Sequence, residues 1–314
     1  IEKQRGISVT SSVLQFNYQG KCINILDTPG HQDFSEDTYR TLMAADCAVM
    51  VIDAAKGVEA QTIKLFKVCT LRHIPIFTFV NKMDREARDP FELMENIEEI
   101  LGIKTYPMNW PISCGKDFKG VYDRNAKRVL AFESDGRANG VKMVDEIEAE
   151  LGDPALDTLI GAANHQKLAD DIELLDGAAE EFDLAAVQHG ELSPVFFGSA
   201  LTNFGVEPFL KEFLRLTPTP LPRKDSVSGE LVDPCSEQFS GFVFKIQANM
   251  NKNHRDRIAF LRICSGKFER GMEAFHVQEG KNIKLATGTS LMADDRAIVS
   301  EAYAGDIIGL FDPG

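Results

Sequence analysis

Four short apolar segments, each followed directly by a polar loop, do most to limit the folds open to this 314-residue chain. They are 23–26 before DTPGH, 49–52 before DAAKG, 76–80 before NKMD and 195–197 before GSA. Near-continuous apolar runs of this length suit strands buried on both faces of a parallel sheet. Helical patterns lie between them, as at 59–72 and 90–101. The alternation predicts an α/β doubly wound sheet, whose ligands bind at the carboxyl ends of its strands.

The spacing between the third and fourth segments predicts an insertion. About 30 residues suffice for one crossover between parallel strands, yet Asp84 and Ser199 lie 115 residues apart. We therefore expect an inserted subdomain at roughly 105–190, with strands and glycine turns first and acidic helices afterwards.

A proline-rich linker leads to a region with a different pattern. The prolines of TPTPLPRKD and the polar run SVSGELVDP favour a domain boundary. From GFVFKIQ onward, the apolar residues recur with a period of two, which is typical of strands. We predict a first domain at 1–220, a linker at 221–237, and an all-β, barrel-like domain at 238–314 that ends incomplete.

Composition excludes several functional classes. Hydrophobic residues make up 44% and charged residues 26% of the chain, as in ordinary soluble proteins. No apolar run reaches the ~20 residues that a membrane span needs. Six cysteines without a CxxC pair argue against zinc and against disulfides, so we expect the reducing cytoplasm and no membrane contact. Nothing in the sequence indicates more than a monomer.

The net charge of −14 disfavours an extended nucleic-acid interface, because such interfaces need a basic surface. Any contact with RNA must therefore be local, or docking must use proteins. One local exception is the basic cluster Lys252, His254, Arg255 and Arg257. A binding hairpin and a solvated loop explain this cluster equally well.

The DTPGH segment at 27–31 offers residues suited to a nucleotide's phosphates. Asp27 can hold a magnesium ion through its water shell, because magnesium on nucleotides keeps several waters. Gly30 lacks a side chain, so its amide can approach a terminal phosphate. His31 can orient the attacking water, which is most of what phosphoryl transfer requires. By itself, the segment equally suits a strand–turn–helix corner with a loop histidine.

The NKMD segment at 81–84 offers residues suited to a purine base. Asp84 can accept from two N–H donors on guanine, which adenine cannot offer. Asn81 can bridge neighbouring loops and the base, and Lys82 can lay its stem over the purine. A polar loop between a strand and a helix is the plain alternative, since these residue types are common there.

The GSA segment supplies a third, weaker element. After Gly198 and Ser199, the backbone amide of Ala200 can reach the guanine carbonyl oxygen, although a tight turn explains the segment equally well in isolation. The order is more specific than any one motif. DTPG, NKxD and Ser-Ala at successive strand ends form a guanine-nucleotide signature, which predicts that GTP or GDP binds at Asp27, Thr28, Pro29, Gly30, His31, Asn81, Lys82, Asp84, Ser199 and Ala200.

The signature resembles that of the translational GTPases, because His31 follows DTPG and because RGIS at 5–8 is similar to their RGIT switch element. The resemblance implies a P-loop GTPase-type sheet, a catalytic role for His31, and magnesium ligation by Ser8 and, through water, by Asp27. The family has threonine at the position of Ser8; serine keeps the hydroxyl but lacks the methyl group. DAAKGV at 53–58 also matches the family, and we assign Asp53 a packing role.

Two long stretches, SPVFFGSALTNFGVEPFL and GFVFKIQANMNKNHRDRIAFLRICSGKFERGM, resemble the peptide chain release factor 3 family. That family uses GTP to remove class I release factors from the ribosome after peptide release. The resemblance therefore implies the ribosome, through its proteins and rRNA, as partner. It also implies an indirect action on class I release factors. The alternatives are an elongation factor G-like or ribosome-protection GTPase, and a non-hydrolysing ribosome-binding module.

The most important departure from the family pattern is the absence of its phosphate-binding loop, since no GxxxxGK[ST] occurs in the chain. That loop supplies the amides and the lysine that hold the phosphates. We expect the loop and the first strand to lie upstream of Ile1, and we take the chain as a fragment at both ends. On this interpretation the first domain is a GTP-binding domain without its P-loop, inactive by itself.

Overall fold

The computed structural model describes residues 12–28, 35–132, 146–178, 181–248, 257–285, 288–292 and 295–312. The chain forms two compact units, which are Cys47–Thr217 and the pair Ile1–Asp46 with Pro218–Gly314. The division into domains at 1–220 and 238–314 stays a prediction. Within the described residues, no helix is both long and apolar enough to cross a bilayer.

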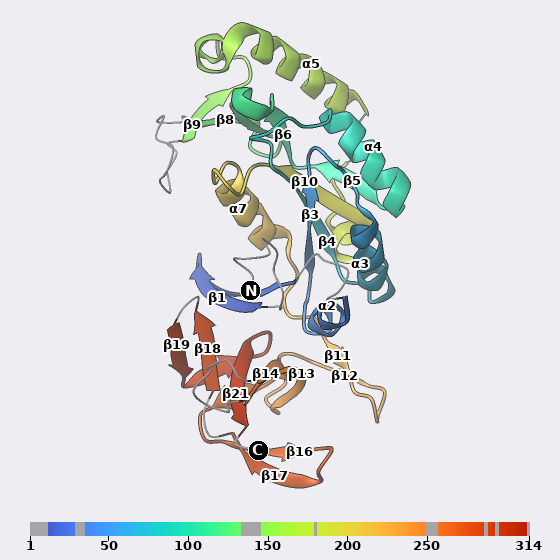
Figure 1. Ribbon diagram of the computed structural model, residues 1–314, viewed down its shortest axis with the longest axis vertical. Coiled ribbons are helices and arrows are strands. Elements are labelled where there is room, and N and C mark those ends of the chain that lie inside the picture. Colours follow the sequence, from blue (N-terminus) through green and yellow to red (C-terminus); the bar gives the residue numbers. More distant parts are fainter. Residues whose placement is uncertain are drawn as a thin grey trace. The chain divides into compact units, whose positions relative to one another are not determined.

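A parallel sheet forms the centre of the Cys47–Thr217 unit (Figure 1). Its strand order is β3 (Ala48–Asp53), β4 (Ile76–Asn81), β10 (Leu192–Phe197) and β5 (Lys104–Pro107), and all neighbours run parallel. Every residue of β10 is buried, as are five of the six in β4. The α/β sheet is thus confirmed, with three of the four predicted segments in it.

Helices cover both faces of this sheet, because its strands present apolar side chains to each side in turn. On one face Phe77 and Phe79 meet Phe213 and Phe209 of α7 (Val206–Leu216) edge to face, at centroid distances of 5.0 and 5.2 Å. The short helix α6 (Leu184–Gln188) adds Val187 to the same cluster. On the other face lie α3 (Ala60–Leu71) and α4 (Pro90–Leu101), as Figure 1 shows.

Local chemistry fixes the ends of α4. Asp89 caps its first turn by accepting a hydrogen bond from the Phe91 amide, and Pro90 stands at the first helical position, where no amide is needed. Gly102, with a φ of 68°, ends the helix in the left-handed region that favours glycine. These caps fix the strand–helix connection that follows NKMD.

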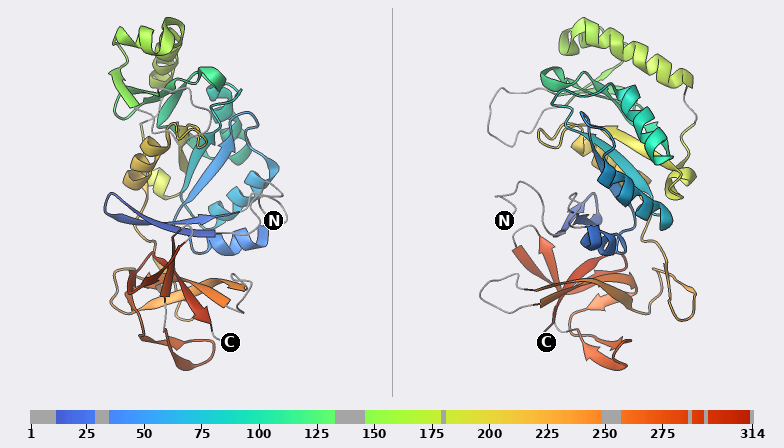
Figure 2. Two further views of the ribbon diagram at one scale, coloured as in Figure 1. Left: turned by 60° about the vertical axis from the view of Figure 1, so that its left-hand side comes forward. Right: turned by 45° about the vertical axis from the view of Figure 1, so that its right-hand side comes forward.

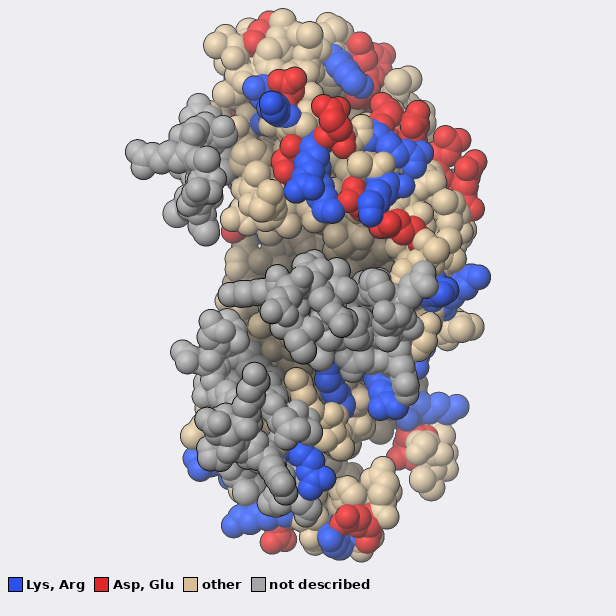
Figure 3. Space-filling view, in the orientation of Figure 1, with Lys and Arg blue, Asp and Glu red and all other residues tan. Residues whose placement is uncertain are grey.

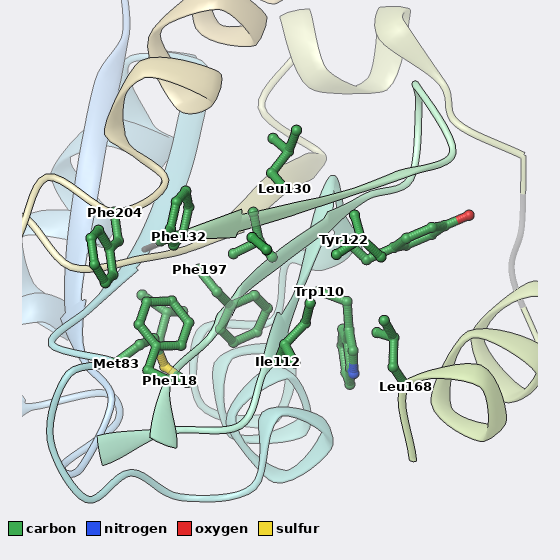
Figure 4. Packing of buried hydrophobic residues seen from close by; sticks show 14 of the residues in the cluster. Met83, Trp110, Ile112, Phe118, Tyr122, Leu130, Phe132, Leu168, Phe197 and Phe204 are labelled. Carbon is green, nitrogen blue, oxygen red and sulfur yellow. The ribbon is translucent and has the colours of Figure 1, made fainter. Parts of the chain in front are cut away.

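The insertion is an antiparallel sheet with a long helix. Its order is β6 (Asn109–Ile112), β7 (Gly120–Asp123), β8 (Arg128–Phe132) and β9 (Glu146–Glu150), followed by a π-helical turn (Asp157–Gly161) and α5 (Ala162–Ala178). Trp110 of β6 is fully buried and lies near Phe197 in the core (Figure 4). It also packs against Phe91, and its indole N–H donates to Asp171 at 3.0 Å. The insertion therefore shares one apolar core with the parallel sheet.

The other unit is built mainly of antiparallel strands. Its main sheet has the order β13 (Ser240–Ala248), β14 (Arg257–Ser265), β21 (Ile307–Asp312), β18 (Gly288–Met292), β19 (Asp295–Val299). Three short pairs accompany it: β11 (Arg223–Lys224) with β12 (Leu231–Val232), β15 (Lys267–Glu269) with β20 (Glu301–Tyr303), and β16 (Glu273–His276) with β17 (Lys281–Lys284). The all-β prediction for this region is confirmed, and closure into a barrel stays a prediction.

The predicted place of segment 23–26 in the parallel sheet is wrong. It belongs to β2 (Lys21–Asp27), which pairs antiparallel with β1 (Ser12–Tyr18) along its whole length, in the long blue hairpin of the left view in Figure 2. Gln19 and Gly20 both have positive φ, at 47° and 75°, which suits the two-residue turn of a tight hairpin. The turn gives β2 a local partner, and Ile25 is 41% exposed. The helix α2 (Ser35–Leu42) follows in the same unit.

Candidate functional site

Three loops lie side by side at the carboxyl ends of β3, β4 and β10. The parallel register sets Asp53 beside Asn81, and Phe197 beside Val80. Backbone hydrogen bonds extend this pairing beyond the strands, from the Ala54 amide to the Asn81 carbonyl at 3.0 Å, the Gly198 amide to the Val80 carbonyl at 3.0 Å, and the Met83 amide to the Gly198 carbonyl at 3.1 Å. The NKMD and GSA segments, 115 residues apart in sequence, thus meet at one sheet edge.

Asn81 joins two of these loops through its side chain. Its Oδ1 accepts a hydrogen bond from the Lys82 amide at 2.8 Å and another from the Ala200 amide at 2.9 Å. The link between neighbouring loops expected of Asn81 is therefore present, and its contact with the base stays a prediction. The Ala200 amide, which we expected to face a guanine carbonyl, donates to Asn81 instead. A ligand that uses this amide must share it with Asn81 or displace it.

Asp84 is held by one of its two carboxylate oxygens. The hydroxyl of Ser199, which is fully buried, donates to Asp84 Oδ1 at 2.5 Å. Oδ2 has no protein partner among the residues that the structure describes. The carboxylate is thus oriented by the fold, while one oxygen keeps its full capacity to accept hydrogen bonds.

Lys82 adopts a left-handed backbone conformation, with a φ of 71°, and reaches back to β3. Its Nζ lies 2.7 Å from Oδ2 of Asp53, the last residue of that strand. Burial alone would raise the pKa of the Asp53 carboxyl, but hydrogen bonds from Lys82 and Ala55, with the charges of Lys82 and Lys56, lower it on balance. Asp53, for which the sequence predicts only a packing role, thus also forms an ion pair.

Gly198 leaves no room for a larger residue. A Cβ at this position would lie 2.5 Å from the Phe204 carbonyl oxygen and 2.8 Å from a ring carbon of Phe79. Since real Cβ contacts are longer than this, the turn before Ser199 requires glycine. Gly198 therefore serves the packing of the turn, and the contact of the Ala200 amide with guanine stays a prediction.

A cavity of about 360 Å³ adjoins the site. It is lined by Asp84, Gly115, Lys116, Phe118, Lys119, Phe132, Thr202 and Phe204. Leu201, the residue after Ala200, is 76% exposed and so leaves its apolar side chain open at this end of the sheet. Leu201 stands directly after the Ser-Ala pair, so it lies at the same end of β10 as the loops of the site.

The residues predicted to hold phosphate and magnesium are only partly described. Asp27 ends β2, and Thr28 follows it in the unit that holds Ile1–Asp46. Ser8, Pro29, Gly30 and His31 lie outside the described residues, as do Lys252, His254 and Arg255 of the basic cluster. In the described part of the chain, no three His, Cys, Asp or Glu side chains gather as a metal would need. The roles of Asp27, Ser8 and His31 stay predictions.

Comparisons with known proteins place this geometry in context. Residues 1–219 match the family model of the elongation factor Tu GTP binding domain, and residues 238–314 match elongation factor G domain 2. The chain is 61% identical to peptide chain release factor 3 of Symbiobacterium thermophilum, and 57% identical to those of Synechocystis and Lacticaseibacillus casei. All of this chain is covered in each case, but only 59%, 57% and 59% of these relatives.

A solved structure from Thermus thermophilus has the same fold. It superposes with a TM-score of 0.73 over 99% of this chain and 45% of its own, at 24% sequence identity. At that identity the likeness concerns the fold alone.

Proposed function

Because this chain belongs to the translational GTPases, with a GTP-binding domain of the elongation factor Tu type, we propose that it binds guanine nucleotides at the ends of β3, β4 and β10. We further propose that the whole protein acts as a peptide chain release factor 3. It uses GTP to free class I release factors from the ribosome after peptide release. The curated relatives reported above carry that name, and the elongation factor G-like alternative is not favoured.

The geometry of Asp84 is the observation that carries the proposal. Guanine presents an N1–H and an exocyclic amine on one edge, and the two oxygens of a carboxylate can accept one each, because Oδ1 keeps a second acceptor site beside the Ser199 hydroxyl. Adenine has no N1–H, so it cannot make this pair of bonds. The hydrogen bond from Ser199 orients the carboxylate before a ligand arrives, which favours selective binding.

Two side chains offer apolar surface that would contact the faces of a purine in this proposal. Lys82 offers its four-carbon stem, and Leu201 offers an exposed apolar side chain next to Ala200. Apolar contact to both faces of the base would complement the polar recognition of its edge. The residues present thus fit a guanine base.

Hydrolysis depends on the segment that follows β2. In our proposal His31 orients the attacking water and the amide of Gly30 contacts the terminal phosphate. Asp27, through water, and Ser8 would hold magnesium, which neutralises phosphate charge when it is bound. The phosphate-binding loop of the family would complete this half of the site.

We propose that this part of the protein docks on the ribosome through local contacts, because its net charge of −14 disfavours a long RNA interface. On the face seen in Figure 3, acidic and basic side chains are interspersed over the upper part of the molecule, where the parallel sheet and its insertion lie. Such a surface favours contacts with ribosomal proteins and single phosphates over a continuous RNA track. We propose that the protein works as a monomer in the cytoplasm.

Release of a labelled class I release factor from ribosomes after peptide release tests the proposed function. The full-length protein with GTP should accelerate this release, and His31→Ala should retain GTP binding while it loses ribosome-stimulated hydrolysis. Translocation of tRNA should be unaffected by the same protein. Translocation without release-factor turnover would instead indicate an elongation factor G-like activity, and binding without hydrolysis by the wild type would indicate a non-hydrolysing module.

A further inference from the structure

We propose that Asp53 is a positioning residue of the guanine site, which holds Lys82 so that its stem lies where the purine binds. This inference rests on the proposed function, because it concerns the same site. It changes the role of Asp53 from packing to ligand recognition through Lys82.

Asp53 is a fixed anchor. It ends β3 in register with Asn81, and the pairing of the two strands continues through the hydrogen bond from the Ala54 amide to the Asn81 carbonyl. Its Oδ1 accepts from the Ala55 amide at 2.9 Å, while its carbonyl accepts from the amides of Lys56 and Gly57. The side chain of Asp53 is only 16% exposed. Oδ2 is therefore presented in one direction.

Lys82 depends on such an anchor. Its left-handed φ of 71° gives the side chain a different direction from the one it would have in an extended strand. Its side chain is 45% exposed, and in the described part of the chain its recorded ion-pair partner is Asp53, at 2.7 Å. Because the lysine side of this ion pair is exposed, the pair adds little to the stability of the fold. Its consequence lies instead in where the lysine stem points.

Anchoring the ammonium group favours binding through entropy. A free lysine side chain samples many rotamers, and a ligand that immobilises it loses affinity for that reason. When Asp53 holds the Nζ of Lys82 before the ligand arrives, the lysine stem is already extended. The side chain therefore loses less rotamer freedom when the ligand binds. Lys56 does not compete for this place in the structure, because its ammonium pairs with Glu59 at 3.2 Å.

A double-mutant cycle on GDP affinity tests the inference in the full-length protein. Asp53→Asn keeps an oxygen that can accept from the Ala55 amide but removes the charge that holds Lys82. Lys82→Met keeps an apolar stem without the ammonium group. We expect Asp53→Asn to weaken binding of a fluorescent GDP by about fivefold in the wild-type background, and to have almost no effect in the Lys82→Met background.

Equal losses in both backgrounds, or no loss in the wild type, would overturn the inference, since Asp53 would then act by packing or not at all. Melting temperatures of all four proteins show whether a loss of binding reflects unfolding. Failure of the wild type to prefer GDP over ADP would overturn the proposed function and this inference together. A preserved guanine preference with equal losses would overturn the inference alone.

Discussion

Two aspartates illustrate how differently the two units use a carboxylate. In the parallel-sheet unit, Asp84 receives one hydrogen bond, from Ser199, and keeps its Oδ2 without a described protein partner. In the other unit, Asp46 uses both oxygens, since Arg262 donates to Oδ2 at 2.6 Å and the Leu221 amide donates to Oδ1 at 3.0 Å. Arg223 lies 3.6 Å from the same Oδ1.

The two arginines also hold the turn that precedes Asp46. Arg262 donates to the Ala44 carbonyl at 3.0 Å, and Arg223 donates to the Ala45 carbonyl at 2.8 Å. The turn after α2 is thus fixed to β14 and to the segment at β11. A carboxylate with every oxygen engaged by protein donors stabilises the fold, whereas one oriented through a single oxygen is prepared for a ligand.

The largest effect should come from Arg262→Leu. Arg262 is buried, and its loss would remove the closest donor to Asp46 and leave the Ala44 carbonyl without its partner. Breaking a buried ion pair typically lowers the free energy of unfolding by about 3 kcal/mol. Unfolding in denaturant would measure this loss in the free energy of unfolding. Arg215→Leu is the matched control, because its pair with Glu212 is exposed and should contribute less than about 0.5 kcal/mol. Equal losses of unfolding free energy in the two variants would contradict the distinction between a buried and an exposed ion pair.

Gly198→Ala should disturb the site that Asp84 occupies. The new Cβ would clash with the Phe204 carbonyl, and overpacking of this kind lowers stability by about 1–3 kcal/mol. The shift of the Ser199 loop should also weaken nucleotide binding. Gly152→Ala is the control, since a Cβ there meets nothing within 4 Å. Unchanged thermal stability and GDP affinity in Gly198→Ala would mean that the loop adjusts freely.

Ser199→Ala should weaken GDP binding by about tenfold, because Asp84 loses the hydrogen bond that orients it and one such bond to a charged group contributes about 1.5 kcal/mol. Ser193→Ala is the control. Ser193 shares a buried 2.8 Å hydrogen bond with Thr78 in the same sheet, so its loss should lower stability without altering GDP affinity. Calorimetric titration would separate the two, and a tenfold loss in both variants would contradict a specific role for Ser199.

The smallest effect concerns a third aspartate, on the insertion. His165 has Asp157 at 2.7 Å from one ring nitrogen and the Leu151 carbonyl at 2.7 Å from the other. Two acceptors favour the protonated ring, which raises the pKa of His165 above its ordinary 6.5. The stability contributed is therefore complete below pH 6.5 and is lost as the pH rises through the raised value. Melting curves across this range should show a slope that His165→Asn removes; an equal slope in the variant would contradict this assignment.

The sequence predicted the loops of the site better than their contacts. Apolar strands followed by NKMD and GSA were sufficient to place Asn81, Asp84 and Ser199 at one sheet edge, because parallel strands end together. The ion pair of Asp53 was missed, since it depends on the left-handed backbone of Lys82. No local sequence pattern predicts the ion pair of Asp46 and Arg262, because the two residues are 216 positions apart in the chain.

Segment 23–26 shows why strand patterns do not fix strand partners. An apolar run predicts a strand, but Asn24 within it and the turn at Gln19 and Gly20 favour a local antiparallel hairpin. Asn24 then accepts from Gln15 and donates to Asp306, so its polar side chain has partners in the structure. The two residues Gln19 and Gly20 between two strand-like runs are the signal that could have corrected the prediction.

Base selectivity tests the central claim most directly. Fluorescent GDP would be bound to the full-length protein and to its Asp84→Asn variant, with GDP, ADP and xanthosine diphosphate as competitors. We predict that the wild type prefers GDP. Asp84→Asn should lose about 100-fold in GDP affinity and gain affinity for xanthosine diphosphate, whose second carbonyl accepts from the asparagine amide. Equal competition by ADP and GDP in the wild type, or an unchanged preference in the variant, would contradict the account.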